Sequence, residues 1–235
     1  MTGCARGHRP ACNQGWSATG RSDDYASGSH RPEGPANNNV TSLPQNVAVV
    51  IDGWNALRGA DQVLDFGDQI DRYVIDFGKL PDEIAAQRNR PSRVVSVTVV
   101  IGVHNRAQNP RARMIADQNI RFWQRDKRVQ VIAFENHWES GIEKGVDMEL
   151  GLQVMDQAGD PKVDSVMVFS ADRDLQPAVD RAVSRPRAHI ELARWEGQSA
   201  GLWIRQGNGK PGWCHWLGSE TFHKVATPRG HQLAA

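Results

Sequence analysis

Five short apolar runs, separated by stretches with helical spacing, make up the hydrophobic pattern of this chain. The runs lie at 47–51, 93–103, 129–134, 163–169 and 189–193, and the first two are rich in β-branched residues. Continuous apolar runs of this length are typical of strands that are buried on both faces. Apolar residues spaced three or four positions apart predict helices over 61–77, 109–126, 143–157 and 174–184.

Strands and helices therefore alternate along the chain, and the connections are long enough for crossovers. This order predicts an α/β fold, a three-layer α/β/α sandwich with a mostly parallel central sheet. We place this folded domain at residues 46–196.

The flanking segments differ from the domain in composition. Residues 1–45 are rich in Gly, Ser, Asn, Pro and Arg and hold almost no aliphatic side chains, so we expect a disordered N-terminal tail. Residues 197–226 form a Trp- and Gly-rich extension, which we expect to pack on the domain, with Trp203, Trp213 and Trp216 covering one end of the core. Residues 227–235 are expected to be a second disordered tail.

Composition narrows the choice of partners and compartment. The 235 residues carry a formal net charge of +1, so any surface that attracts nucleic acid must be local. No apolar run approaches the length of a membrane span, and no apolar segment follows the first basic residues, so we expect a cytoplasmic protein without a membrane partner. The three cysteines are not spaced as a disulfide framework. The oligomeric state stays open, and a homodimer is compatible with the sequence.

Three acidic residues stand at positions that carry chemistry. Asp52 directly follows the first run, and Asp172 follows the fourth. Parallel strands end at the same sheet edge, where ligands bind in open α/β folds, so the two carboxylates can be neighbours. Asp147 lies near the start of its predicted helix, on or beside the side that faces the sheet, where a carboxylate needs a partner.

Three carboxylates gathered at one edge repel each other unless a cation lies among them. Oxygen ligands without neighbouring Cys or His favour Mg²⁺ or Mn²⁺ over zinc. Such ions bind phosphate oxygens and activate water for the hydrolysis of phosphodiesters. The pattern therefore predicts a metal site held by Asp52, Asp147 and Asp172.

Residues beside these carboxylates have both structural and functional interpretations. Asn55 can hold a carboxylate, a water or a phosphate with its amide. Asp174 either caps a helix or supports the metal site. Ser170 either serves the turn, or orients a carboxylate and contacts substrate. Lys144 either binds a substrate phosphate or pairs with a neighbouring acid.

A basic segment favours a polyanionic partner. Between His104 and Arg128 there are seven Lys or Arg residues and two acids. Charge runs are often only solvated helix surface, but a local basic face of this kind also suits RNA. We single out Arg106, Arg111 and Arg113 as candidate RNA contacts.

The motifs resemble those of a known family. Asp52-Gly53-Trp54-Asn55 resembles the D-G-x-N opening of the NYN domains, a branch of the PIN-like nuclease superfamily. Residues 143–147 resemble the E-K-G-x-D motif of that family and residues 170–174 its S-x-D-x-D motif, in family order. The resemblance implies a PIN-like fold and a metal-dependent endoribonuclease that acts on RNA.

The resemblance also assigns roles. It implies Asp52, Asp147 and Asp172 as metal ligands, and Asn55 and Asp174 as supporting catalytic residues. One alternative is a catalytically idle NYN module that binds RNA or a protein partner, although a decayed site should have lost an acid and none is missing. Another is a haloacid-dehalogenase-like phosphatase, which needs a second Asp where this chain has Trp54.

Overall fold

The computed structural model describes residues 43–64, 72–136, 144–185, 187–198, 201–205 and 212–229. The elements follow one another as β1 (Gln45–Asp52), α1 (Gly53–Leu64), β2 (Tyr73–Ile75), α2 (Leu80–Ala86), β3 (Ser92–Val103), α3 (Pro110–Trp123), β4 (Val129–Glu135), α4 (Val146–Gly159), β5 (Ser165–Phe169), the 3₁₀ turn η2 (Arg173–Leu175), α5 (Gln176–Val183), β6 (His189–Trp195), β7 (Cys214–Leu217), α6 (Ser219–Val225) and β8 (Ala226–Pro228).

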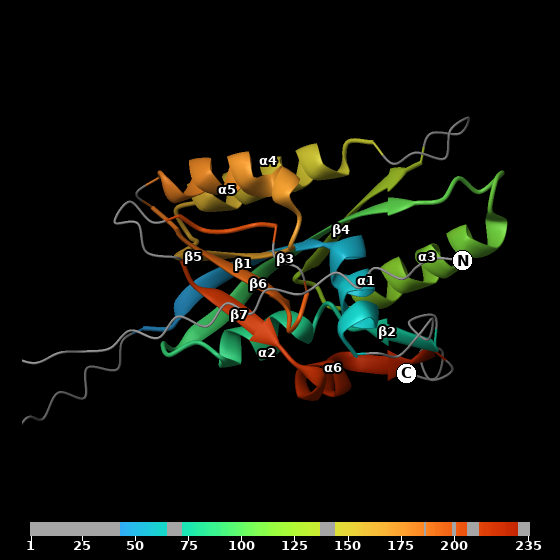
Figure 1. Cartoon of the computed structure of the whole chain (residues 1–235), viewed down its shortest axis with the longest axis horizontal. Helices are drawn as coiled ribbons and strands as arrows, with labels where there is room; N and C mark the ends of the chain where they lie inside the picture. Colours follow the sequence, from blue (N-terminus) through green and yellow to red (C-terminus); the bar gives the residue numbers. More distant parts are fainter. Residues whose placement is uncertain are drawn as a thin grey trace, which may run out of the picture. The chain divides into compact units, whose positions relative to one another are not determined.

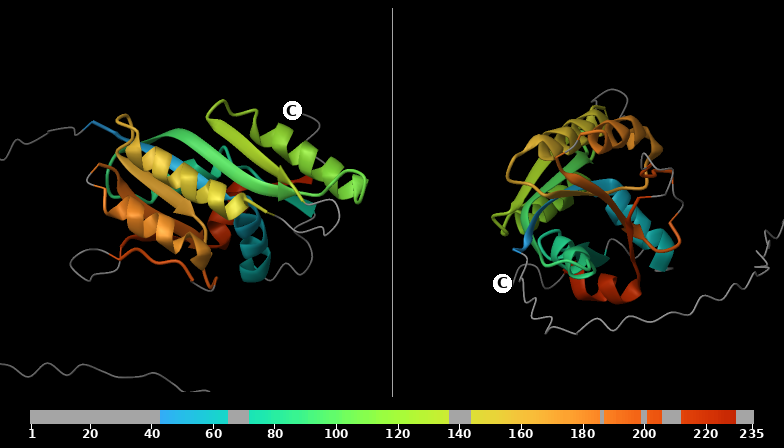
Figure 2. Two further views of the ribbon diagram at one scale, coloured as in Figure 1. Left: turned by 90° about the horizontal axis from the view of Figure 1, so that it is seen from above. Right: turned by 90° about the vertical axis from the view of Figure 1, so that its left-hand side faces the viewer.

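A six-stranded sheet in the order β4-β3-β1-β5-β6-β7 forms the centre of the molecule, and all its neighbouring strands are parallel. Helices α4 and α5 cover one face, while α1, α2 and α6 lie on the other (Figure 1). The end-on view in Figure 2 shows the sheet between these two layers. The predicted α/β sandwich with a mostly parallel sheet is therefore confirmed.

Each face of the sheet has its own apolar core because β1 is buried on both sides. Val47, Val49 and Ile51 belong to the core under α1, α2, α3 and α6. Ala48 and Val50 belong to the core under α4 and α5. This explains why the first run is continuously apolar rather than alternating.

The predicted helix over 61–77 is wrong in its position. Helix α1 begins at Gly53, directly after β1, and packs Ala56, Leu57 and Ala60 against the sheet. Val74 lies in the short strand β2, and the residues between Leu64 and Arg72 lie outside the described part. The prediction missed the helix start because small alanines carry most of its inner face.

The segment after β2, for which the sequence pattern predicted no helix, contains α2. Pro81 stands in the first turn of that helix, where a missing N–H costs nothing, and Leu80 and Ile84 are buried. The described part contains no helix that is long and apolar enough to cross a membrane.

The C-terminal extension and the residues after it contribute two strands to the fold. Strand β7 is the sixth strand of the sheet and pairs with β6. Strand β8 pairs with β2, so Thr227 and Pro228, placed in the second tail by the prediction, are paired with Val74 and Tyr73. Gln45, placed in the first tail, begins β1, and residues 1–42 of that tail lie outside the described part.

The three tryptophans expected to cover the core are instead well exposed. The exposed fractions of Trp203, Trp213 and Trp216 are 49%, 59% and 42%. Trp203 and Trp216 lie over the guanidinium of the buried Arg194, at 5.4 and 5.1 Å. The edge strand β7 has no outer neighbour among the described residues, so nothing described buries Trp216 further.

A charged cluster is buried where the strands begin, which we call the amino edge of the sheet. The Arg88 guanidinium lies 2.7 Å from the Glu191 carboxylate, and His215 Nε2 lies 2.7 Å from the other carboxylate oxygen. Burial by itself raises the pKa of Glu191, but the hydrogen bonds to His215 and Arg88 outweigh it and hold the pKa below its ordinary value.

Replacing Glu191 with Gln leaves the Arg88 guanidinium buried without a counter-charge. We expect the free energy of unfolding at neutral pH to fall by about 3 kcal/mol, because removing one partner of a buried ion pair exposes the desolvation cost of the other. The pKa of Glu191 is lowered in the folded protein, so its contribution is lost as the pH falls below 4.5, and the two proteins should converge in acid. Urea unfolding across a pH series measures both effects.

The matched control is Glu220→Gln, because Glu220 is 86% exposed and pairs with Lys224 at 3.1 Å on the surface. We expect little or no change in this variant, since exposed pairs contribute little. Equal losses in the two variants would contradict a stabilising role for the buried cluster.

Candidate functional site

The winding of the sheet reverses at β1. The chain runs from β1 outward through β3 to β4, and then α4 carries it across the other face to β5, on the opposite side of β1. In open α/β sheets such a reversal leaves a crevice outside the carboxyl ends of the strands. A hollow of about 280 Å³ lies there, which we call the carboxylate hollow, and it is lined by Asp52, Trp54, Asn55, Arg58, Gly59, Asp147, Asp172 and Gln198.

Asp52, the last residue of β1, is held in place at the floor of this hollow. Its side chain accepts a hydrogen bond from the backbone N–H of Asn55 at 3.0 Å and one from the Ser170 hydroxyl at 3.2 Å. Asp52 is 8% exposed. A Cβ atom at Gly53 would lie 2.9 Å from the Ile101 side chain, so the glycine lets α1 start close against β3.

Ser170 connects the two strand-end carboxylates. The residue is fully buried after β5, donates to Asp52 and accepts from the backbone N–H of Asp172 at 3.0 Å. Asp172 in turn accepts from the backbone N–H of Asp174 at 3.0 Å and so caps the turn η2. The cap predicted for Asp174 is therefore provided by Asp172, and Asp174 is exposed.

Asn55 is fixed by two donors. Its side-chain oxygen accepts from the backbone N–H of Ala171 at 3.0 Å and from the Gln198 amide at 2.9 Å. Since the first of these donors follows β5, Asn55 ties the start of α1 to the loop that carries Asp172.

Burial and neighbouring acids raise the proton affinity of two carboxylates of the hollow, Asp52 and Asp147. Burial raises the pKa of Asp52 to about 6 against its two hydrogen bonds, and the charges of Asp172 and Asp147 add to the rise. The pKa of Asp147 is also raised, by partial desolvation and by the charges of Asp172 and Asp174. Of the described side chains that line the hollow, only Arg58 is cationic.

Asp147 reaches the hollow from the first turn of α4, but not as a buried residue. The prediction placed Asp147 on or beside the side of the helix that faces the sheet. In the structure its side chain is exposed to solvent, and Val146 and Leu150 are the buried residues of that turn. Gly145 precedes the helix with a φ of 89°, a conformation that favours glycine. Glu143, the first residue of this motif, lies outside the described residues.

The donor set of the hollow fits a hard divalent cation. Three carboxylates supply oxygen ligands only, which suits Mg²⁺ or Mn²⁺, and their mutual repulsion is what a cation would relieve. Within the described residues, no three acidic, histidine or cysteine side chains already converge on one point as a ready coordination shell. Asp52, Asp147 and Asp172 line one hollow rather than one such point.

The arginines predicted to contact RNA lie elsewhere and are largely paired. Arg106 and Arg113 both bind Asp117 at 2.8 Å, and Arg113 also lies 3.1 Å from Glu135. None of Arg106, Arg111, Arg113 and Lys144 is among the described residues that line the carboxylate hollow. Asp117, an acid of the same segment, and Glu135 therefore engage two of the three arginines that were expected to contact RNA.

Sequence reasoning missed two polar side chains of the hollow, Arg58 and Gln198, as well as Gly59. Arg58 lies one helical turn after Trp54 and its guanidinium lies 4.9 Å from the centre of the indole ring, a spacing of four residues that could have suggested the contact. Gln198 comes from the Gly-rich extension, where no motif or period indicates it.

The NYN domain family model matches residues 46–200 of the chain. The search of curated proteins found no match to this chain. Among solved structures, one similar chain is a protein of unknown function from Vibrio parahaemolyticus, with 16% sequence identity and a TM-score of 0.44, over 67% of this chain and 85% of that one.

The raised pKa of Asp52 predicts how Asp52→Asn changes stability. The folded protein binds the Asp52 proton more tightly than the unfolded chain does. The charged Asp52 carboxylate therefore lowers the free energy of unfolding, and this loss is absent below pH 3.8 and complete above about pH 6. We expect the metal-free variant to be more stable than the parent at neutral pH by up to about 3 kcal/mol, since each pKa unit corresponds to about 1.4 kcal/mol. Urea unfolding in EDTA measures the difference at several pH values.

Asp156→Asn is the matched control, because Asp156 is exposed on α4 away from the hollow. Its stability should follow that of the parent across the same pH range. A variant at Asp52 that is less stable than the parent at neutral pH would show that the carboxylate is stabilising where it lies.

Proposed function

Because this chain belongs to the NYN domain family, we propose that it is a metal-dependent endoribonuclease that hydrolyses phosphodiester bonds of RNA. Membership of the family suggests a PIN-like nuclease fold, and the parallel α/β sheet agrees with it. One observation carries the proposal: Asp52, Asp147 and Asp172, which come from three separate segments, line one hollow at the reversal point of the sheet.

The metal would be Mg²⁺ or Mn²⁺, held by Asp52, Asp147 and Asp172. When bound, such an ion supplies a water of lowered pKa and stabilises charge on phosphate oxygens. In the hydrolysis the water would give up one proton as its oxygen bonds to phosphorus, the bond from phosphorus to the leaving oxygen would break, and the leaving oxygen would take up one proton.

The side chains around the carboxylates have distinct parts in this proposal. Ser170 and Asn55 are positioning residues, because each holds one strand-end loop against the other. Arg58, whose guanidinium lies over the Trp54 indole, would meet a substrate phosphate. Lys144, exposed just before α4, and the exposed Asp174 flank the acidic loops.

Asp52→Asn should abolish RNA cleavage while leaving the fold intact, because the amide keeps the size of the side chain and removes a ligand charge. The measurement is cleavage of a labelled single-stranded RNA by the purified protein across a Mg²⁺ and Mn²⁺ series. EDTA should stop the parent protein, and Asp156→Asn should cleave like the parent.

Cleavage that persists unchanged in Asp52→Asn would rule out this site as the source of activity and point to a contaminating nuclease. RNA binding without cleavage by the parent, at any metal concentration, would instead support the idle binding module. In that case affinity should fall steeply with salt.

Asp147→Asn separates a metal ligand from a structural acid. If Asp147 is a ligand, the metal-free variant should melt at the same temperature as the parent or higher, because like-charge repulsion is reduced. The rise in melting temperature on adding millimolar Mn²⁺ should shrink, since binding to the native state stabilises it by mass action. Thermal melts with and without Mn²⁺ measure both, and a lower metal-free melting temperature with an intact Mn²⁺ response would remove Asp147 from the site.

A further inference from the structure

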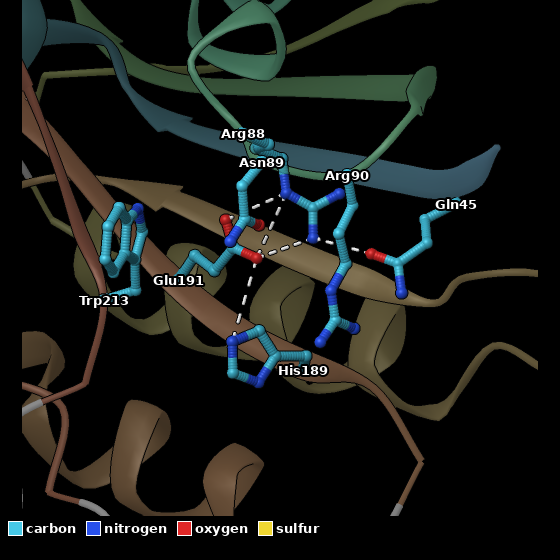
Figure 3. A pocket seen from close by; sticks show the side chains of 7 residues that line it. All are labelled: Gln45, Arg88, Asn89, Arg90, His189, Glu191 and Trp213. Carbon is cyan, nitrogen blue, oxygen red and sulfur yellow. Dashed lines mark hydrogen bonds and ion pairs between the residues drawn. The ribbon is translucent and has the colours of Figure 1, made fainter. Parts of the chain in front are cut away.

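A second polar hollow lies at the amino edge of the sheet, at the other end of the strands from Asp52. It measures about 370 Å³ and is formed by the beginnings of β1 and β6, the residue before β7 and the loop between α2 and β3 (Figure 3). Strand β1 runs from this edge to Asp52, a span of roughly 23 Å at the usual rise of a strand. The amino-edge hollow is therefore separate from the carboxylate hollow.

The wall of the amino-edge hollow is built from buried charges that are fully engaged. Arg88 donates to Glu191, Gln45, Ser92 and Ser165, and both its side chain and that of Glu191 are only 5% exposed. His215 Nε2 also lies 2.7 Å from the Glu191 carboxylate. One carboxylate is thus surrounded by groups that can carry positive charge, so the wall does not repel an anion.

The groups that face solvent in the hollow make few contacts with the fold. His189 Nε2 lies 3.8 Å from the Glu191 carboxylate, and the Trp213 ring lies edge-on to that of His215 at 6.1 Å. The Arg90 side chain is exposed and has no hydrogen bond or ion pair with the described residues. The His189 side chain is 56% exposed, and Trp213 is 59% exposed. Figure 3 shows the Trp213 indole on one side of the hollow and the Arg90 guanidinium on the other, with Arg88 and Glu191 between them.

An exposed indole that faces a guanidinium and an imidazole across a hollow of this size matches one kind of ligand chemistry. A planar base can stack on the indole, and a phosphate can be held by the guanidinium and the imidazole. A divalent cation would find only the Glu191 carboxylate, already taken by Arg88 and His215. A carboxylate ligand without a ring would leave the indole unused.

We propose that the amino-edge hollow binds a nucleoside 5′-phosphate, stacked on Trp213 with its phosphate on Arg90 and His189. The same chemistry is presented by a free nucleotide and by the phosphorylated end of an RNA strand. The site is independent of the carboxylate hollow, so it stands whether or not the chain cleaves RNA.

The test is calorimetric titration of the full chain in EDTA with adenosine 5′-monophosphate, adenosine, and oligoadenylates that carry either a 5′-phosphate or a 5′-hydroxyl. The monophosphate should bind, and adenosine should bind at least about tenfold more weakly, because it lacks the group that Arg90 and His189 hold. Arg90→Gln and Trp213→Ala should each weaken binding of the monophosphate by about tenfold or more.

Matched controls come from the same regions of the surface. Trp203→Ala removes an indole that is 49% exposed but does not line the hollow, and Arg93→Gln removes an exposed arginine three residues after Arg90. Both should bind the monophosphate like the parent. Thermal melts of the four variants check that each is folded at the temperature of the titration.

The oligonucleotides distinguish the two sources of the ligand. Tight binding of the 5′-phosphorylated strand with weak binding of the 5′-hydroxyl strand supports an RNA end. Binding of the monophosphate but not of the phosphorylated strand supports a free nucleotide. Absence of monophosphate binding at millimolar concentration, or equal binding in the parent and in both Arg90→Gln and Trp213→Ala, would overturn the proposal.

Discussion

The pairing of β1 with a parallel strand on each side is the constraint on which the rest of the structure depends. The register places Ile51 opposite Val99 of β3 and Phe169 of β5, so β1 and β5 end together at the same edge. Helices α1, α2 and α3 pack against one core and α4 and α5 against the other, so the chain changes faces between β4 and β5. Asp52 and Asp172 meet because of this register, and α4 adds Asp147 because it crosses the second face.

The pKa values of the buried carboxylates at the two ends of the strands are shifted in opposite directions. At the carboxyl edge, Asp52 is buried among other acids, and its pKa rises to about 6. At the amino edge, Glu191 is also buried, but Arg88 and His215 bind it and its pKa falls. Burial alone would raise both pKa values, so the neighbouring charges decide the sign. A carboxylate whose pKa is raised by burial and by nearby acids, as at Asp52, is expected where a cation binds, and one with a lowered pKa where the protein supplies its own cation.

The segment after Trp195 is part of both edges. Strand β7 extends the sheet beside β6 and brings His215 to Glu191, with Trp213 just before it. Gln198 reaches the carboxylate hollow and binds Asn55 at 2.9 Å. Strand β8 then pairs with β2 on the side of the sheet that α1 covers. The folded unit is therefore longer than the part that carries the three motifs, and the extension contributes to the architecture and to both hollows.

The sequence by itself determined five of the strands (β1, β3, β4, β5 and β6), the three-layer architecture and the acidic residues of the hollow. Runs such as 47–51 carry a local signal, because a strand buried on both faces must be apolar at every position. The ends of the first and fourth runs then predicted that Asp52 and Asp172 share an edge, which depends only on the strands being parallel. Tertiary structure decided what depends on contacts between distant segments: the start of α1, where Gly53 lies against Ile101, and the exposure of Asp147. It also decided the pairing of Arg106 and Arg113 with Asp117 and the joining of Gln198 to Asn55. Apart from the Arg113–Asp117 pair, whose spacing of four residues is that of one helical turn, these contacts link residues that no periodicity connects, so only the packed chain can specify them.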